Sequence, residues 1–279
     1  MGQRVEEEAL TLDDKAAVRD RLERCVVAIE EMVDGKLFDH HCDTVGLEVE
    51  LDLVEPLGGP HLANDRVLAK LDRPELQQEL GQFNIELNVA PHRLAGDVLP
   101  VLHRELDATL DQCSQQAERL GARVMAIGTL PTLRPRHITV DLLSSNPRYA
   151  LLSKRMHAER GEPFRVDIQG AERLCFESET VAAEAAATSL QLHLRVRPED
   201  FARFYNAAQS AAVAQIAAGA NSPYALGLQL WAETRIPLCE QVLDVRPHVN
   251  GAPPRVWMGD HWVSSPTELE RHALIAFSA

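Results

Sequence analysis

The sequence predicts an α+β fold, in which a mainly antiparallel sheet has helices packed on one face. Some segments carry apolar residues at every second position, which is typical of strands, and others carry them three and four positions apart, which is typical of helices. Hairpin-like connections mix with connections that cross over through a helix, and this mixture favours the α+β class. With 279 residues, 45% of them hydrophobic, and no internal repeat, the chain can bury a proper core as one large domain or two small ones.

Three helices are expected, over residues 13–34, 96–120 and 198–218, because apolar residues recur there every three or four positions. The first begins with two aspartates and the third with Pro-Glu-Asp, which suit the amino-terminal end of a helix. Gly35 and Gly121 mark the ends of the first two.

The third helix begins a long uncharged stretch, residues 204–232. Length alone would allow this stretch to span a membrane, which takes roughly 20 apolar residues. Polar residues such as Asn206 and Gln215 interrupt it, however, and much of the remainder is Ala, which is barely hydrophobic. We therefore expect a buried, closely packed helix that runs into a loop, and no membrane span.

Five strands are expected between these helices. Loops rich in Pro and Gly are expected at 56–60, 130–136 and 251–254. The alternation of apolar and polar residues, or a short apolar run, places the strands at 45–54, 82–89, 123–128, 164–169 and 188–196.

Three of these strands carry a second, polar row. In "QFNIELNV", residues 82–89, the apolar row is Phe83, Ile85, Leu87 and Val89, and the polar row is Gln82, Asn84, Glu86 and Asn88. Strands 45–54 and 188–196 show the same design. If the apolar rows all pack on the helices, the polar rows form one surface that presents Glu48, Glu50, Glu86, Asn84, Asn88, Gln191 and His193.

Carboxylates gathered on one surface repel each other unless cations neutralise them. This surface lacks Lys and offers oxygen ligands with one His, a set that suits Mg²⁺ or Mn²⁺. Since Mg²⁺ usually shares its coordination sphere with substrate phosphates, the surface suggests a nucleotide site built on a sheet. The alternative is an ordinary solvated sheet face, which antiparallel sheets often have.

Composition excludes several classes of protein. A formal charge of -14 and a pI near 5.2 argue against nucleic-acid and anionic-membrane partners. Five Cys without a CxxC pair suggest reduced thiols in a cytoplasmic protein, and the acidic start has no apolar segment typical of a signal peptide. The sequence also lacks a P-loop, a Rossmann fingerprint and a GxSxG motif, so any catalysis would depend on metal and positioning.

Seven motifs together resemble the glutamate-cysteine ligase family of the plant-like and actinobacterial type. In order, they are "GLEVELDLV", "ELGQFNIELNVAP", "IGTLPTL", "NPRY", "TSLQLHLRV", "ANSPYALG" and "ETRI" with "LDVR", over roughly 45–246. The resemblance implies a glutamine synthetase-like catalytic fold, a curved sheet whose concave face binds ATP and Mg²⁺. It also favours a single domain over residues 1–279, implies small-molecule substrates and allows a homo-oligomer.

The resemblance assigns roles to particular residues. The implied metal ligands are Glu48, Glu50, Glu79, Glu86 and His193, although the plant branch has Asn in place of His193. Glu79 joins this set only if Gly81 breaks the strand, because odd spacing otherwise puts it opposite to Glu86. Arg235 and Arg246 are implied for carboxylate and phosphate binding, as Arg grips either group bidentately. The implied substrate-binding residues are Asn84, Asn88, Arg148, Gln191 and Asn221.

The implied reaction is ATP-dependent joining of the γ-carboxylate of glutamate to the amine of cysteine, through γ-glutamyl phosphate. Another amine acceptor and a non-catalytic, ligand-binding homologue stay open as alternatives. The family's later E-x-R element has no counterpart after Arg246. We therefore expect an amino-terminal part of a longer enzyme or a shortened homologue, with an open sheet edge and an exposed apolar patch that favour self-association.

Overall fold

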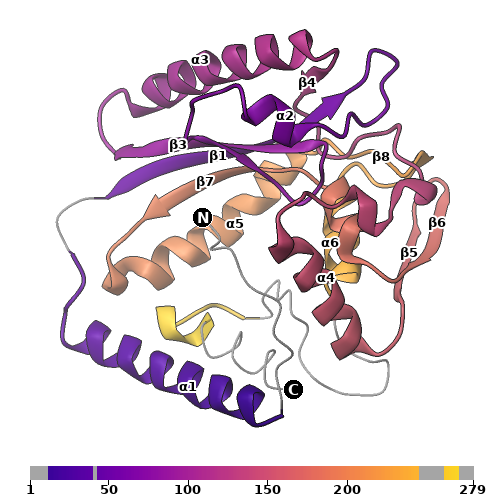
Figure 1. Ribbon diagram of the computed structural model, residues 1–279. Coiled ribbons are helices and arrows are strands. Elements are labelled where there is room, and N and C mark those ends of the chain that lie inside the picture. Colours follow the sequence, from indigo (N-terminus) through magenta and orange to yellow (C-terminus); the bar gives the residue numbers. More distant parts are fainter. Residues whose placement is uncertain (1–11, 40–42, 245–260, 270–279) are drawn as a thin grey trace.

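A computed structural model of the chain describes residues 12–39, 43–244 and 261–269 (Figure 1). Helices and antiparallel strands are mixed, which confirms the α+β class. The helices are α1 Leu12–Asp34, α2 Asn64–Leu68, α3 Val98–Arg119, α4 Pro147–Arg160, α5 Phe201–Gly219 and α6 Arg235–Val242. Four short 3₁₀ helices are η1 Pro135–His137, η2 Val140–Leu142, η3 Val181–Ala186 and η4 Pro198–Asp200.

The main sheet has five strands, in the order β2-β3-β1-β4, with β7 also paired to β1. Its strands are β1 Thr44–Val54, β2 Leu76–Gln78, β3 Asn84–Arg93, β4 Arg123–Met125 and β7 Leu190–Arg195. All its pairs are antiparallel, and β7 and β4 share one edge of β1, pairing with residues 44–49 and 52–54. The remaining strands form two hairpins, β5 Phe164–Gln169 with β6 Arg173–Ser178, and β8 Tyr224–Ala225 with β9 Leu228–Gln229.

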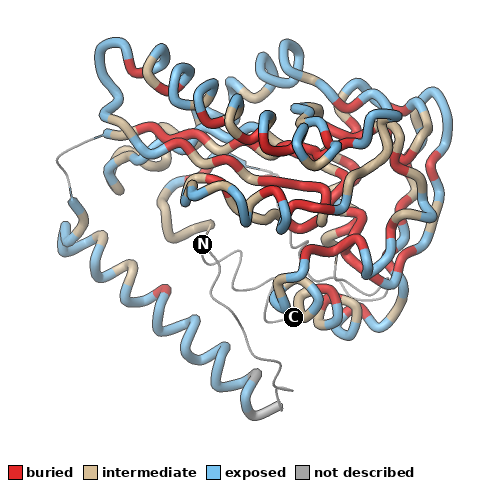
Figure 2. The backbone as a smooth tube through the Cα atoms, turned by 45° about the horizontal axis from the view of Figure 1, so that its top comes forward, coloured by how far each residue is buried: buried red, intermediate tan, exposed pale blue. Residues whose placement is uncertain are grey.

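Two apolar cores support this arrangement. In the first, α3 lies along the sheet (Figure 1), and its buried Leu102 and Cys113 pack with the apolar rows of β1 and β3. This confirms the predicted apolar face of the second helix. The second core joins the β5-β6 hairpin, η3 and α6, and includes Phe83 and Leu133. Figure 2 shows buried residues concentrated in these two regions.

Two predictions about helix burial are wrong. No residue of α5 is buried, so its Ala-rich surface does not pack closely against the described part of the chain. In α1, Val26 is the one residue with a described side chain that is buried, and Val18 and Leu22 are exposed although they stand four positions apart on the predicted apolar face. Periodicity therefore located both helices correctly but did not establish a packing partner for either.

Several strand and helix boundaries also differ from the prediction. Strand β3 starts at Asn84, so Gln82 lies in the preceding turn, where its amide nitrogen donates to the carbonyl of Asp141 at 2.7 Å. Helix α4 went unpredicted, although Asn146 caps its first turn and Gly161, with a φ of 72°, ends it. The predicted loop at 251–254 lies outside the described residues.

Among the described residues, no helix is sufficiently long and apolar to cross a membrane. Residues 204–232, predicted as a helix that runs into a loop, comprise most of α5 followed by the β8-β9 hairpin.

Strand β7 exposes the apolar row that its neighbour buries. Leu190, Leu192 and Leu194 are 61%, 52% and 48% exposed. They lie directly opposite Val49, Leu47 and Val45 of β1, all of which are buried. The apolar face of the sheet therefore continues past its helical cover, which confirms the expected exposed patch.

We predict that Leu192→Lys lowers self-association, because a charge on an edge strand opposes both strand pairing and apolar contact. Light scattering across a concentration series measures the effect. Leu57→Lys is the matched control, since Leu57 is 96% exposed in a loop away from this row. Equal scattering from the wild-type protein and the Leu192→Lys variant would show that the exposed row does not drive association.

Candidate functional site

The register of the main sheet places the polar rows on one face. Residues directly opposite each other in an antiparallel pair point to the same side. Across β1 and β3 these pairs are Glu48 with Asn88, Glu50 with Glu86, and Asp52 with Asn84; across β1 and β7, Glu48 pairs with Gln191 and Gly46 with His193. We call the acidic members Glu48, Glu50, Asp52 and Glu86 the carboxylate face.

Neighbouring donors hold the outer carboxylates of this face. The amide of Gln191 donates to one oxygen of Glu48 at 2.9 Å, and His193 Nε2 lies 3.4 Å from the other. The backbone N–H of Ser189 donates to Glu50 Oε2 at 2.8 Å. These contacts fix the side chains but leave the crowding of negative charge largely unrelieved.

Burial, with the crowding of negative charge as a smaller cause, raises the pKa of several carboxyls. Burial is the main cause of the raised pKa of Glu48, the charge of Glu86 adds to it, and His193 opposes it. Burial also raises the pKa of Glu50, and Glu48 and Glu86 contribute. Each group is harder to deprotonate chiefly because burial disfavours its charged form, and in addition because its neighbours carry negative charge.

Glu79 joins this group through a break in the chain between β2 and β3. The segment from Glu79 to Phe83 belongs to neither strand, so Gly81 interrupts the alternation as its predicted placement required. The carboxyl of Glu79 is hydrogen-bonded to that of Glu86, and burial, followed by the nearby carboxylates, raises the pKa of Glu79 to about 8. A hydrogen bond between two carboxyls requires that one of them is protonated. The raised pKa means that Glu79 keeps its proton at neutral pH and can share it with Glu86.

One end of the carboxylate face, at Asp52, is part of a buried polar network. Asn84 is 1% exposed, and its amide nitrogen donates to Asp52 Oδ1 at 2.7 Å. Asn64 in turn donates to the carbonyl of Asn84 at 2.9 Å. Burial raises the pKa of Asp52 well above its ordinary value. In this arrangement the amide of Asn84 supports Asp52 and is turned away from solvent.

Arg235 is held rigidly at the start of α6. Its Nε and Nη2 donate to the two oxygens of Glu233 at 2.5 and 2.6 Å, and its Nη1 donates to the carbonyl of Thr188 at 2.7 Å. The hydrogen bond to Glu233 is the main cause of the raised pKa of Arg235. Gly128 permits this packing, because a Cβ there would lie 3.0 Å from the guanidinium carbon and 2.7 Å from the carbonyl oxygen of Asn221.

A cavity of about 940 Å³ connects Arg235 with the carboxylate face. Four charged side chains line it: Glu50, Glu184, Glu233 and Arg235. Thr188, Asn221 and Cys239 add polar groups, and residues such as Ile127 and Ile216 add apolar wall. The cavity therefore combines an acidic side, which attracts cations, with the guanidinium of Arg235.

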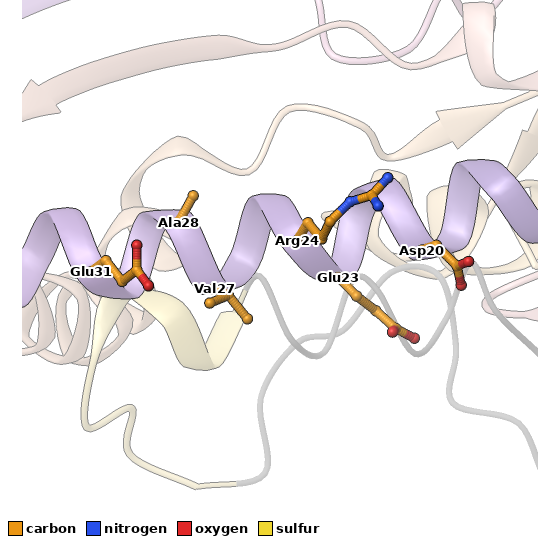
Figure 3. Close-up of a pocket in the computed structure, with 6 residues that line it drawn as sticks. All are labelled: Asp20, Glu23, Arg24, Val27, Ala28 and Glu31. Carbon is orange, nitrogen blue, oxygen red and sulfur yellow. The ribbon is translucent and has the colours of Figure 1, made fainter.

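A second hollow lies along α1, and side chains from different elements do not come together in it. Figure 3 shows its lining residues Asp20, Glu23, Arg24, Val27, Ala28 and Glu31, all of which project from that one helix. It is a surface groove, so the larger cavity is the candidate site.

The structure brings most of the implied site residues to this region. Asn221 lines the cavity, and Asn88 donates to Glu86. Arg148 is exposed at the start of α4, with its guanidinium 6.0 Å from the ring of Tyr149. Arg246 lies outside the described residues.

Four further residues at the site had not been predicted: Glu184, Glu233, Tyr149 and Cys239. Burial, with Glu79 as the next cause, raises the pKa of Tyr149 to about 12. Burial also raises the pKa of Cys239 to about 11, and Glu184 and Glu50 add to that shift. Of the four, Glu233 and Tyr149 stand inside the motifs "ETRI" and "NPRY". In each motif a role was predicted only for the nearby arginine, Arg235 or Arg148.

The chemistry of the donors fits a divalent cation, although the described side chains do not form a finished site. In the described part of the chain, no group of three or more His, Cys, Asp or Glu is arranged to hold a metal ion. Yet Glu79 and Glu86 share a hydrogen bond, and Glu48 and Glu50 have raised pKa values on the same face. A hard cation would relieve this repulsion through oxygen ligands.

Comparison with known proteins agrees with this geometry. The family profile of glutamate-cysteine ligase family 2 (GCS2) matches residues 44–264, and the chain belongs to this family. A protein of Paenarthrobacter aurescens (strain TC1), named "Putative glutamate--cysteine ligase 2-3", is 36% identical over 115 residues. That stretch is 40% of this chain and 25% of the relative, so the similarity covers a quarter of the relative's length.

The raised pKa of Glu79 predicts how the stability of the fold depends on pH. A carboxyl whose pKa rises on folding, here from 4.5 to about 8, stabilises the fold most below pH 4.5 and loses that contribution as the pH rises to about 8. Melting temperatures in EDTA should therefore fall over this range, and Glu79→Gln should make the fall shallower. The exposed Glu118 provides the control variant, Glu118→Gln. An unchanged slope in Glu79→Gln would contradict the shared proton.

Proposed function

We propose that the protein is an ATP-dependent ligase that joins the γ-carboxylate of glutamate to an amine, with cysteine as the first candidate acceptor. The observation that carries this proposal is the cavity in which Glu50 of the carboxylate face and Arg235 line the same space. Membership of glutamate-cysteine ligase family 2 supports the choice of substrates. We also propose the glutamine synthetase-like fold, which the antiparallel main sheet supports.

The central difficulty of this reaction is the approach of two anions, a carboxylate and a triphosphate. At about 4 Å, two unit charges repel by roughly 4 kcal/mol near a protein surface. Bound Mg²⁺ or Mn²⁺ would neutralise phosphate charge, and Glu48, Glu50, Glu79 and Glu86 would hold it, with His193 at the rim. The side chains of Asn88 and Gln191 would orient substrate by hydrogen bonds.

Arg235 supplies the fixed positive charge. Its guanidinium is anchored by Glu233 and by the carbonyl of Thr188, so little reorganisation is needed when an anion approaches its remaining N–H groups. In the proposed reaction it stabilises the charge that develops on the transferred phosphoryl group. A cation in this role can contribute about 10³ or more in rate. Arg148 and Asn221 are proposed to contact substrate from the rim, and Arg246 to provide a second basic group.

We expect ADP release that requires both glutamate and an amine. A coupled ADP assay with glutamate and a panel of amines, cysteine included, measures it. Arg235→Lys should retain nucleotide binding but lose most of the turnover, because an ammonium cannot reproduce the bidentate contact with Glu233. If glutamate or nucleotide binds and no amine supports ADP release, the non-catalytic alternative would replace the ligase.

Metal binding should stabilise the fold by mass action. At a hundredfold excess over the dissociation constant the gain is about 2.7 kcal/mol. We predict that Mg²⁺-ATP raises the melting temperature relative to EDTA, and that Glu86→Gln reduces this rise. Without metal, Glu86→Gln should be at least as stable as the wild-type protein, since one repelling charge is gone. Equal rises in both proteins would remove Glu86 from the metal site.

A further inference from the structure

Glu184 lines the candidate cavity and lies in a closely packed segment of backbone. It belongs to η3, whose other five residues, Val181, Ala182, Ala183, Ala185 and Ala186, are all buried. Four alanines and a valine, between 0% and 4% exposed, leave this segment little freedom to move. Glu184 is the one charged residue of the segment, and its side chain lines the cavity. A carboxylate is thus presented to the cavity at a fixed position.

The surroundings of Glu184 place it beside the proposed chemistry. Glu50 and Arg235 line the same cavity, so Glu184 shares one space with the carboxylate face and with the fixed guanidinium. Its charge also acts on Cys239, which stands one helical turn after Arg235 in α6 and lines the cavity too. Glu184, Glu50 and Arg235 therefore line one cavity together with Cys239.

The two other carboxylates of the cavity have different tasks. Both oxygens of Glu233 accept hydrogen bonds from Arg235, so protonation of Glu233 would release the guanidinium. Glu50 accepts from the backbone of Ser189 and belongs to the carboxylate face. Glu184 lines the cavity from a different element, η3, which carries none of the implied metal ligands.

Amide formation requires such an acceptor. An amine is protonated at neutral pH and has no lone pair until it loses a proton. We propose that Glu184 is the general base that takes this proton from the acceptor ammonium, an inference that rests on the proposed ligase function. The freed amine nitrogen attacks the acyl carbon of γ-glutamyl phosphate, and the C–N bond forms as the C–O bond to phosphate breaks. The phosphate leaves with the electron pair and takes the second proton of the nitrogen, while Glu184 passes the first proton to solvent.

Hydroxylamine tests this role because it is largely neutral at pH 7 and needs no base before it attacks. With cysteine as acceptor, Glu184→Gln should lower kcat by about 10² to 10⁴, the range typical of a lost general base. With hydroxylamine, the same variant should lose less than about tenfold. ADP release with Mg²⁺-ATP and glutamate measures both, and the KM for ATP should stay unchanged. Glu179→Gln, an exposed carboxylate five residues earlier, is the control and should match the wild-type protein with both acceptors.

Glu184→Asp provides a second variant that keeps the carboxylate one methylene shorter. It should show an intermediate loss with cysteine and little loss with hydroxylamine. Equal losses with the two acceptors, in either variant, would overturn the general-base role and indicate a structural one. If the wild-type protein releases no ADP with either acceptor, the proposed ligase function fails, and the role of Glu184 fails with it.

Discussion

The antiparallel register that holds β1 between β3 and β7 is the constraint on which the candidate site depends. It sets Glu48 opposite Asn88 and Gln191, and Glu50 opposite Glu86, while Leu47 and Val49 enter the core on the other side. A slip of one residue would bury the carboxylates and expose the leucines. The apolar contacts with α3 therefore create the core and the carboxylate face in the same step.

The free energy of core formation offsets an arrangement that is unfavourable on the opposite face. Several carboxyls there have raised pKa values because burial and mutual repulsion disfavour their charged forms. The charge of Arg235, by contrast, is compensated within the protein. The carboxylate of Glu233 neutralises it, and the carbonyl of Thr188 helps to hold the guanidinium in place. The second core holds α6 and η3, and residues of both elements line the cavity together with Val49 of the first core. Perturbed pKa values of this kind cluster at functional sites.

The parts of the site that follow from local alternation could be predicted from sequence. Alternate positions in a strand share a face wherever the strand sits, so Glu48, Glu50 and Glu86 could be grouped from the alternation alone. Glu184 and Glu233 could not, because a cavity assembles them from segments distant in the sequence. The burial of α5 was predicted wrongly for the same reason: composition describes a helix but not what covers it. The role of Arg246 and the complete glutamine synthetase-like fold stay predictions.

The central claim is that the carboxylate face and Glu79 hold a shared proton that a divalent cation replaces. Calorimetric titration of Mn²⁺ at pH 7, in two buffers with different enthalpies of ionisation, tests it most directly. Metal binding to protonated carboxyls releases protons, so the measured enthalpy should differ between the buffers, and this difference should shrink in Glu79→Gln. Absence of binding, or binding with the same enthalpy in both buffers, would contradict the account.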